Sequence, residues 1–214
     1  MPKKSAHTKT KEITTPERIH EDERGLERLV FFSDAVFAIA ITLLALEIRL
    51  PATEEYLNDA QLYQALVMIW PEYLSYFISF LVIGTFWINH HRKFRSIRRY
   101  DSGLIMLNLL LMMTVAFIPF PTSIISEYGN QTATIFYALS VTVTSLFSAS
   151  IWWYASYRDR LIDSHLDAYH WQRDFWSSLV TPAVFLLSIP LSLLNADLAK
   201  FSWLLAAVIP MIIR

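Results

Sequence analysis

The amino-acid sequence predicts an all-α integral membrane protein with six transmembrane helices in each subunit. Composition is the first reason: 54% of the 214 residues are hydrophobic, 17% are charged, and the mean hydropathy is +0.36. This is too apolar for an ordinary soluble domain of that length. Long apolar stretches and the placement of basic residues are the other two reasons. The formal net charge of -1 argues against general nucleic-acid binding, and the absence of cysteine excludes a disulfide framework.

Residues 1–24 are polar and charged, too polar for a secretory signal peptide, and we expect them to form a cytoplasmic N-terminal segment. Thr15-Pro16-Glu17 can begin a short helix there, with the threonine as cap and the proline in the first turn. Residues 25–214 are expected to form the six-helix membrane domain.

The first expected span is residues 29–49, about 20 residues, which at about 1.5 Å per residue covers the hydrocarbon core of a bilayer. No residue between Asp34 and Glu47 is charged. Asp34 lies more than a turn inside the apolar stretch, where an ionisable group is costly and should have a partner. The alternative is that Ser33 and Asp34 simply mark a helix start near the positive end of the helix dipole. The apolar residues before them favour the first interpretation.

This span carries two stripes when its residues are placed at about 100° intervals around a helix. An apolar ridge lies on one face and comprises Phe32, Ile39, Leu43, Leu46 and Leu50. Beside it lies a seam of small residues, which let membrane helices approach closely: Ala35, Ala38, Thr42 and Ala45. The pattern suits packing against copies of the same helix, although a ridge that simply faces lipid would have the same spacing.

Five further apolar stretches are expected to span the membrane, at residues 71–91, 104–126, 132–157, 175–194 and 198–213. The connection at 51–70 is expected to be a loop with some helix. Pro119 and Pro121 should bend or end the third span. The last stretch is short for a crossing.

The basic residues orient these spans. All but two of the 18 lysines and arginines, Arg49 and Lys200, fall on one side. This bias predicts a multi-pass protein of the cell membrane with both termini cytoplasmic. The basic run at residues 92–99 is interpreted as lipid headgroup anchors. The tryptophans are interpreted as interface belts, with Trp70 and Trp203 on the outer side and Trp152, Trp153, Trp171 and Trp176 on the inner side.

The first span opens with Arg28-x-x-x-Phe32-Ser33-Asp34, followed by A-V-F-A-I-A-I-T-L-L-A-L-E-I. This motif, at the start of a spanning helix, resembles the first helix of the transmembrane protein 175 family, potassium-selective channels of lysosomes and bacteria. The chain length matches the single six-helix unit of bacterial members. The resemblance implies a homotetramer in the bilayer, with this helix at the centre of the pore. It also implies potassium as the permeant ion, with other monovalent cations left open, no cofactor and no enzymatic activity.

The resemblance, and not the spacing, assigns Ile39, Leu43 and Leu46 as stacked hydrophobic rings in the pore, with Thr42 supplying hydroxyls beside them. A narrow apolar ring can gate by dewetting and select by the cost of stripping water from an ion. The four glycines are isolated, so a backbone-carbonyl filter with paired glycines is not available. Acidic residues near the outer mouth, namely Glu47, Glu54, Glu55 and Asp59, either concentrate cations or belong to an ordinary solvated loop.

Arg28 and Asp34 are six residues apart and poorly placed to pair within one helix. Their partners are therefore expected in the W-I-N-H-H segment of the second span, at matching depth, where the family also carries a tryptophan-and-histidine pattern. The candidate network residues in this segment are Trp87, Asn89 and His90. A metal site at the adjacent His90 and His91 is not expected, because neighbouring helical residues point about 100° apart.

A secondary transporter is the alternative function. Asp34 would serve as a proton- or cation-coupling site, and spans three and five, which contain proline, would be discontinuous helices. The spans show no obvious internal repeat, which argues against this alternative.

Overall fold

The computed structural model describes the backbone of residues 15–50, 56–157, 160–162 and 168–205. Side chains are described over the same ranges except 15–21, 168–178 and 196–197. The regular structure in these ranges is helical, apart from one isolated bridge between Ile97 and Ile162. The predicted all-α class is therefore confirmed. The helices are α1 Thr15–Ala45, α2 Asp59–Met68, α3 Trp70–Ser96, α4 Ser102–Phe117, α5 Pro119–Tyr128, α6 Gln131–Ser156, α7 Ala168–Leu194 and α8 Ala196–Ser202.

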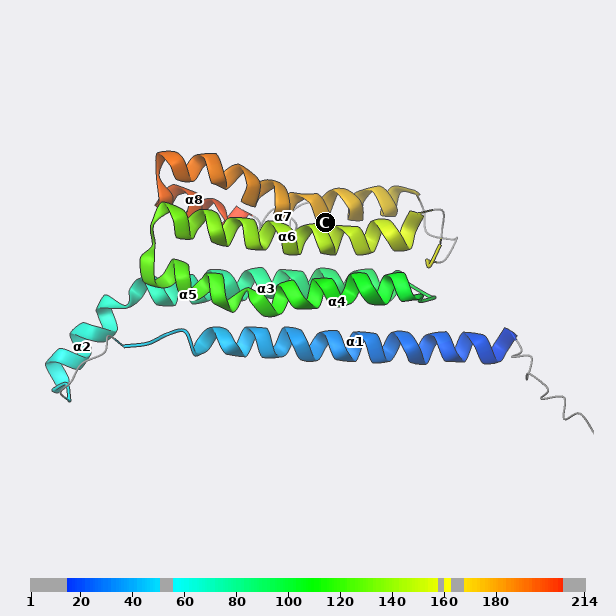
Figure 1. The fold of residues 1–214 in the computed structure, drawn as a ribbon, viewed down its shortest axis with the longest axis horizontal. Helices are drawn as coiled ribbons and strands as arrows, with labels where there is room; N and C mark the ends of the chain where they lie inside the picture. Colours follow the sequence, from blue (N-terminus) through cyan, green and yellow to red (C-terminus); the bar gives the residue numbers. More distant parts are fainter. Residues whose placement is uncertain (1–14, 51–55, 158–159, 163–167, 206–214) are drawn as a thin grey trace, which may run out of the picture.

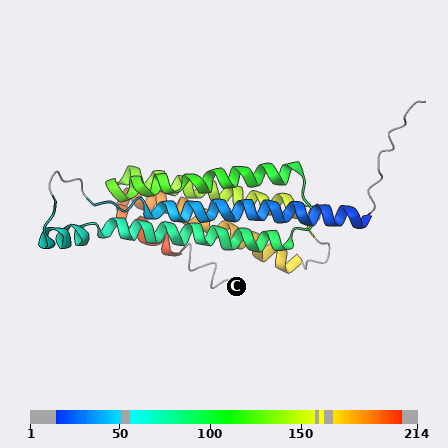
Figure 2. The same cartoon turned by 90° about the horizontal axis from the view of Figure 1, so that it is seen from below.

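The long helices lie side by side in three layers (Figure 1). α1 forms one outer layer, α3 with α4 and α5 forms the middle layer, and α6, α7 and α8 form the other side. Figure 2 shows α1 lying along the line between α3 and α4, both of which it contacts. We call the end of the bundle where α3 passes into α4 the α3–α4 end, and the opposite end the α2 end.

Among the residues that the structure describes, four helical segments are long and apolar enough to cross a membrane, as expected for a membrane protein: Asp22–Ala45, Trp70–Ser96, Ser102–Tyr128 and Gln131–Ser156. A shorter apolar helix covers Leu179–Leu194, within the fifth expected span. Half of the sixth expected span, residues 206–213, lies outside the described residues.

α1 is one continuous helix from Thr15, so the short helix expected at this residue is the start of the first span rather than a separate element. It ends at Ala45, four residues before the predicted end of the span. The reason is a tightened last turn, in which the Leu46 and Glu47 amides donate to the carbonyls three residues earlier, at 3.0 and 3.2 Å.

Proline has different effects in two helices. Pro119 has no amide hydrogen to donate, and the third span is divided here into α4 and α5, as predicted. α7, by contrast, continues through both Pro182 and Pro190. The expectation of a broken fifth span, on which the transporter alternative relied, is therefore wrong for the described backbone.

Three interface interpretations are also wrong. Trp152 and Trp203 are only 1% and 2% exposed, because α6 is covered by its neighbours and α8 folds back onto α6 and α7. Lys93 is no headgroup anchor: it is buried, and its Nζ donates to the Ser148 carbonyl and hydroxyl at 2.7 and 2.9 Å. The last turns of α3 lie against α6, so this side chain points into the bundle. Trp70 and Trp153 are exposed as expected, whereas the side chains of Trp171 and Trp176 lie outside the described residues.

Asp101 joins the helices at the α3–α4 end. One carboxylate oxygen accepts from the Leu104 amide at the start of α4, and the other accepts from the Tyr154 hydroxyl and the Arg160 guanidinium, each at 2.9 Å. Burial alone would raise the pKa of Asp101, but these hydrogen bonds and the charge of Arg160 outweigh it and hold the pKa below its usual value. This residue therefore ties α4 to α6 and to the linker that follows α6.

Candidate pore helix and its polar anchor

α1 has one buried face and one exposed face. Ser33, Phe37, Ala40 and Leu44 are at most 1% exposed, and their spacing of four, three and four residues places them in one stripe against α3 and α4. The predicted pore residues lie on another side and are uncovered within the subunit: Ile39 is 59%, Leu43 39% and Leu46 65% exposed, and Thr42 is also exposed. All members of the small-residue seam are exposed as well. The structure therefore brings the four candidate pore residues together on one uncovered surface, the exposed α1 face.

The hydroxyl of Thr42 is oriented by its own helix. Its Oγ1 donates to the Ile39 carbonyl at 2.9 Å, a local bond that occupies its one hydrogen. The oxygen lone pairs remain available to accept a hydrogen bond or to contact a cation. Thr42 is thus the one position among the four where a polar ligand atom reaches the exposed α1 face.

A buried chain of hydrogen bonds anchors the other face of α1. The Ser33 hydroxyl donates to the Leu29 carbonyl at 2.8 Å and accepts from the Asn108 amide nitrogen at 2.9 Å. The Asn108 amide oxygen lies 2.9 Å from His90 Nε2. We call this Ser33–Asn108–His90 chain, which joins α1 to α4 and α3, the polar anchor. All three residues are at most 1% exposed.

The geometry of the polar anchor sets the histidine tautomer. An amide oxygen can only accept, so His90 Nε2 carries the hydrogen and Nδ1, which has no hydrogen-bond partner, does not. The ring is held between aromatic neighbours, stacked on Phe94 at 4.2 Å and edge-on to Phe37 at 5.6 Å between centroids. This fixes the height and rotation of α1 relative to α3.

Asp34 has a separate partner. The indole Nε1 of Trp87 donates to its carboxylate at 2.8 Å, and the same indole stacks on His91 at 5.9 Å. The side chains of Arg28 and Asn89 form no hydrogen bond or ion pair with any residue that the structure describes. Phe32 lies on the exposed α1 face. Of the seven motif and network candidates, the structure therefore brings together Ser33, Asp34, Trp87 and His90.

Asn108 is the important residue that the sequence interpretation missed. It sits within an otherwise apolar stretch, L-I-M-L-N-L-L-L, and an isolated amide at membrane depth should have attracted attention. A second buried set was missed too: Ser79, Thr122 and Tyr137 form hydrogen bonds of 2.9 Å that join α3, α5 and α6 next to the helix break.

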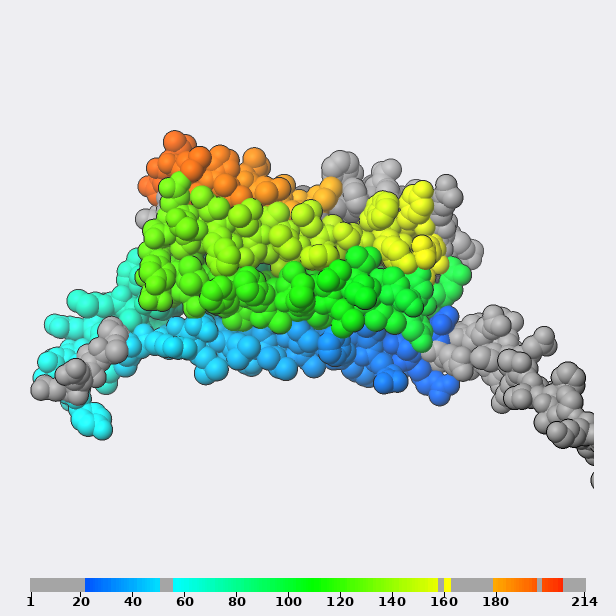
Figure 3. All heavy atoms as spheres, in the orientation of Figure 1, coloured from blue at the N-terminus to red at the C-terminus, as the bar shows by residue number. Residues whose placement is uncertain are grey.

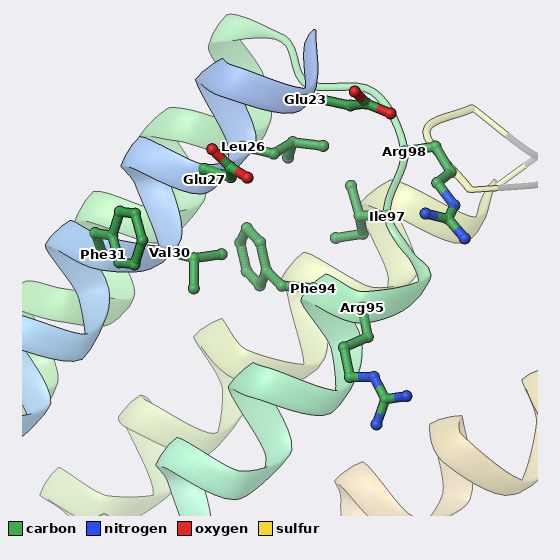
Figure 4. Close-up of a pocket in the computed structure, with 9 residues that line it drawn as sticks. All are labelled: Glu23, Leu26, Glu27, Val30, Phe31, Phe94, Arg95, Ile97 and Arg98. Atoms are coloured by element: carbon green, nitrogen blue, oxygen red, sulfur yellow. The ribbon is translucent and has the colours of Figure 1, made fainter. Parts of the chain in front are cut away.

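Two cavities lie beside the ends of α1. At the α3–α4 end, a cavity of about 540 Å³ separates α1 from the end of α3, with Glu23 and Glu27 on one wall and Arg95 and Arg98 on the other (Figure 4). These charges balance, so this cavity has no single sign of charge with which to concentrate ions. At the α2 end, a cavity of about 490 Å³ is lined by three glutamates and one arginine, namely Glu47, Glu72, Glu127 and Arg49, together with Leu50 and two serines.

Of the other predicted acidic residues, Asp59 lies in the first turn of α2, and Glu54 and Glu55 lie outside the described residues. Among the residues that the structure describes, no group of three or more histidine, cysteine, aspartate or glutamate side chains could hold a metal ion.

A bundle of long apolar helices, with a polar anchor inside and an uncovered apolar helix face outside, is typical of a polytopic membrane protein. Residues 28–119 match the family described as "Endosomal/lysosomal potassium channel TMEM175". A potassium channel of Streptomyces collinus is 40% identical over 146 residues, which cover 66% of this chain and 69% of the relative. A potassium channel of Chamaesiphon minutus is 33% identical over 177 residues, which cover 80% and 86%.

A solved structure supports the same family assignment. The crystal structure of a lysosomal potassium-selective channel TMEM175 homolog from Chamaesiphon minutus superimposes with a TM-score of 0.77 at 30% identity, covering 88% of this chain and 97% of that one. The chain belongs to the TMEM175 family, and the resemblance found in the sequence is confirmed.

Proposed function

We propose that the chain is one subunit of a potassium-selective, leak-type channel in which four copies place α1 around a central pore. The observation that carries this proposal is the exposed α1 face: Ile39, Leu43 and Leu46 are uncovered in the subunit, while the opposite stripe of the same helix is almost fully buried. Such a face can contact lipid, pack against other copies or line a pathway, and the small-residue seam beside it favours contact with other copies. The relatives that are named potassium channels support a pathway.

Selectivity in this proposal comes from side chains. α1 is an unbroken helix from Thr15 to Ala45, so the carbonyls in its interior are engaged in hydrogen bonds within the helix and cannot coordinate an ion as a carbonyl filter does. Rings of Ile39, Leu43 and Leu46 would form a hydrophobic constriction and gate. Potassium sheds water more easily than sodium, so a ring that forces partial dehydration favours potassium.

We also propose six crossings, with Leu179–Leu194 in the fifth and the chain from 198 onward in the sixth, preceded by a cytoplasmic segment of residues 1–24. The charge distribution supports an orientation with both termini cytoplasmic. α1 starts at the α3–α4 end (Figure 1). Arg98 and Arg99 lie between α3 and α4, and Arg160 is bonded to Asp101 at this same end. Arg49 lines the cavity at the α2 end, and Lys200 donates to the Gly129 carbonyl after α5. The glutamate-lined cavity at the α2 end would then add negative potential beside the outer mouth.

The transporter alternative has less support. α7 is continuous through its prolines, and the two bacterial relatives are named as channels. One carboxylate oxygen of Asp34, its proposed coupling site, accepts a hydrogen bond from Trp87.

The test is electrical recording from the purified full-length protein in planar bilayers, with potassium on one side and sodium on the other. A channel of the proposed kind carries current without a coupled ion, and this current does not saturate at low potassium concentration as transport by a carrier does. The current reverses direction at a voltage set by the potassium gradient. Flux that requires a second ion would establish the transporter instead, and a reversal potential near zero would refute potassium selectivity.

A further inference from the structure

Helix α2 forms for local reasons but packs against almost nothing in its own subunit. Asn58 and Gln61 make a capping box, with side chain-to-backbone hydrogen bonds of 3.0 and 2.9 Å, and the Ile69 amide closes the other end on the Ala65 carbonyl at 3.2 Å. An isolated helix of 10 residues is only marginally stable in water. None of the residues of α2 is buried, so its stability calls for a contact outside the subunit.

The exposed surface of α2 is largely apolar. Leu62, Tyr63, Leu66 and Val67 fall within an arc of about 140° around the helix, and they are between 38% and 69% exposed. We call these four residues the α2 stripe. Gln61, Gln64 and Met68 lie outside this arc, on the remaining side of the helix. A cluster of exposed large apolar side chains of this kind marks an interaction surface.

The position of α2 indicates which surface it meets. α2 leaves the outer end of α3 and slopes toward the side of the bundle on which α1 lies (Figure 1). Figure 3 shows its atoms projecting beyond the end of the bundle on that same side. α3 begins at Trp70, an exposed tryptophan of the kind found at membrane interfaces. α2, which precedes it, is therefore placed on the outer side of that interface and toward the exposed α1 face, where the proposed channel axis runs.

The charge of α2 argues against a lipid surface as its partner. Helices that lie on phospholipid headgroups usually carry lysine or arginine on their polar face. α2 contains neither, and Asp59 is its one charged residue. An uncharged apolar stripe fits another protein surface of the same character.

We propose that the α2 stripe packs against the outer end of a neighbouring copy of this chain, so that four α2 helices wall an outer vestibule above the pore. This inference rests on the proposed function, because it uses the arrangement of four copies around α1. The vestibule joins the end of the exposed α1 face to the acidic cavity that contains Glu47, so cations entering the pore pass between these helices.

Cross-linking of single-cysteine variants tests the inference, since the natural chain has no cysteine. The full-length protein is reconstituted in phospholipid vesicles and treated with a short bis-maleimide. Tyr63→Cys and Val67→Cys should lose most of the monomer band on a denaturing gel to dimers and larger species. Met68→Cys, about 170° from the middle of the α2 stripe and also exposed, is the matched control and should remain mostly monomeric. Ala38→Cys reports separately on contact between α1 helices.

The outcomes distinguish the inference from the proposed function. Cross-linking at both Val67→Cys and Ala38→Cys supports both. Cross-linking at Ala38→Cys alone overturns the α2 contact and leaves the α1-centred assembly standing, whereas cross-linking at neither position overturns both. A bimane label on Val67→Cys gives a second measurement. Quenching by brominated phospholipid as strong as that at Leu187→Cys, on α7 far from α1, would place α2 on lipid and overturn the inference.

Discussion

Replacing Asn108 by leucine should show how strongly the polar anchor holds α1. The substitution keeps the side-chain volume similar but removes the acceptor for His90 Nε2 and the donor to Ser33 Oγ. A buried donor left without a partner costs about 1–3 kcal/mol, and a lost neutral hydrogen bond about 0.5–1.5 kcal/mol. Ser33 keeps its bond to the Leu29 carbonyl, so its loss is at the lower end. We therefore expect Asn108→Leu to lower the free energy of unfolding by about 1.5–3.5 kcal/mol.

The assay is equilibrium unfolding in mixed detergent micelles, followed by tryptophan fluorescence. Asn89→Leu is the matched control, because Asn89 is also an amide at this depth of the bundle but its side chain has no partner within the described ranges. This control should change stability by about 0.5 kcal/mol or less. The double variant His90→Phe/Asn108→Leu should recover much of the loss, since replacing both partners by apolar groups can be nearly neutral. Wild-type stability of Asn108→Leu, or strictly additive losses in the double variant, would refute the reasoning.

Three further predictions concern the α1 seam and two carboxylates. Ala38→Leu should weaken the proposed tetramer, because it enlarges a seam residue that is exposed in the subunit. Light scattering in detergent measures the oligomeric state, and an unchanged tetramer would show that the seam is not a packing surface. Asp34→Ala should lower the free energy of unfolding by only about 0.5–1.5 kcal/mol. The loss is small because Trp87, which loses its hydrogen-bond acceptor, is 41% exposed. A wild-type unfolding curve would show that this bond is not stabilising. The pKa of Asp101 is lowered in the folded state, so the ionised carboxylate stabilises the fold above the unfolded pKa of about 3.9. This stabilisation is lost as the pH falls through the folded pKa. Asp101→Asn should remove this part of the acid dependence of unfolding, and an unchanged pH profile would contradict the role given to Asp101.

The sequence predicted those parts of the fold that depend on local chemistry. The uncharged stretch after Asp34 gave the first span, and the missing amide hydrogen of Pro119 gave the helix break. The same reasoning failed for Lys93, Trp152 and Trp203. These residue types are common at membrane interfaces, and only the packing of α6 and α8 against their neighbours decides that they are buried.

Only the part of the candidate site that depends on local helix spacing could be predicted from the sequence. Spacing placed Ile39 and Leu43 on one side of a helix, but it could not decide between lipid, other copies and a pore, because that depends on chains outside the subunit. The polar anchor depends on Asn108, which lies 75 residues from Ser33 along the chain. Pairing across such a separation follows from tertiary packing and not from a local pattern.

The constriction at Ile39 is the central claim, and the reversal potential of Ile39→Asn channels between potassium and sodium tests it most directly. Ile39 is 59% exposed on α1, so asparagine there should not disturb the core of the subunit. A ring of amides stays wet and offers ligands to any small cation, so conductance should rise and the reversal potential should move toward that of a non-selective pore. Leu187→Asn, at an exposed position on α7, is the matched control and should leave the reversal potential unchanged. An unchanged reversal potential in Ile39→Asn, with channels clearly present, would contradict the account and move the filter to Thr42 or Leu43.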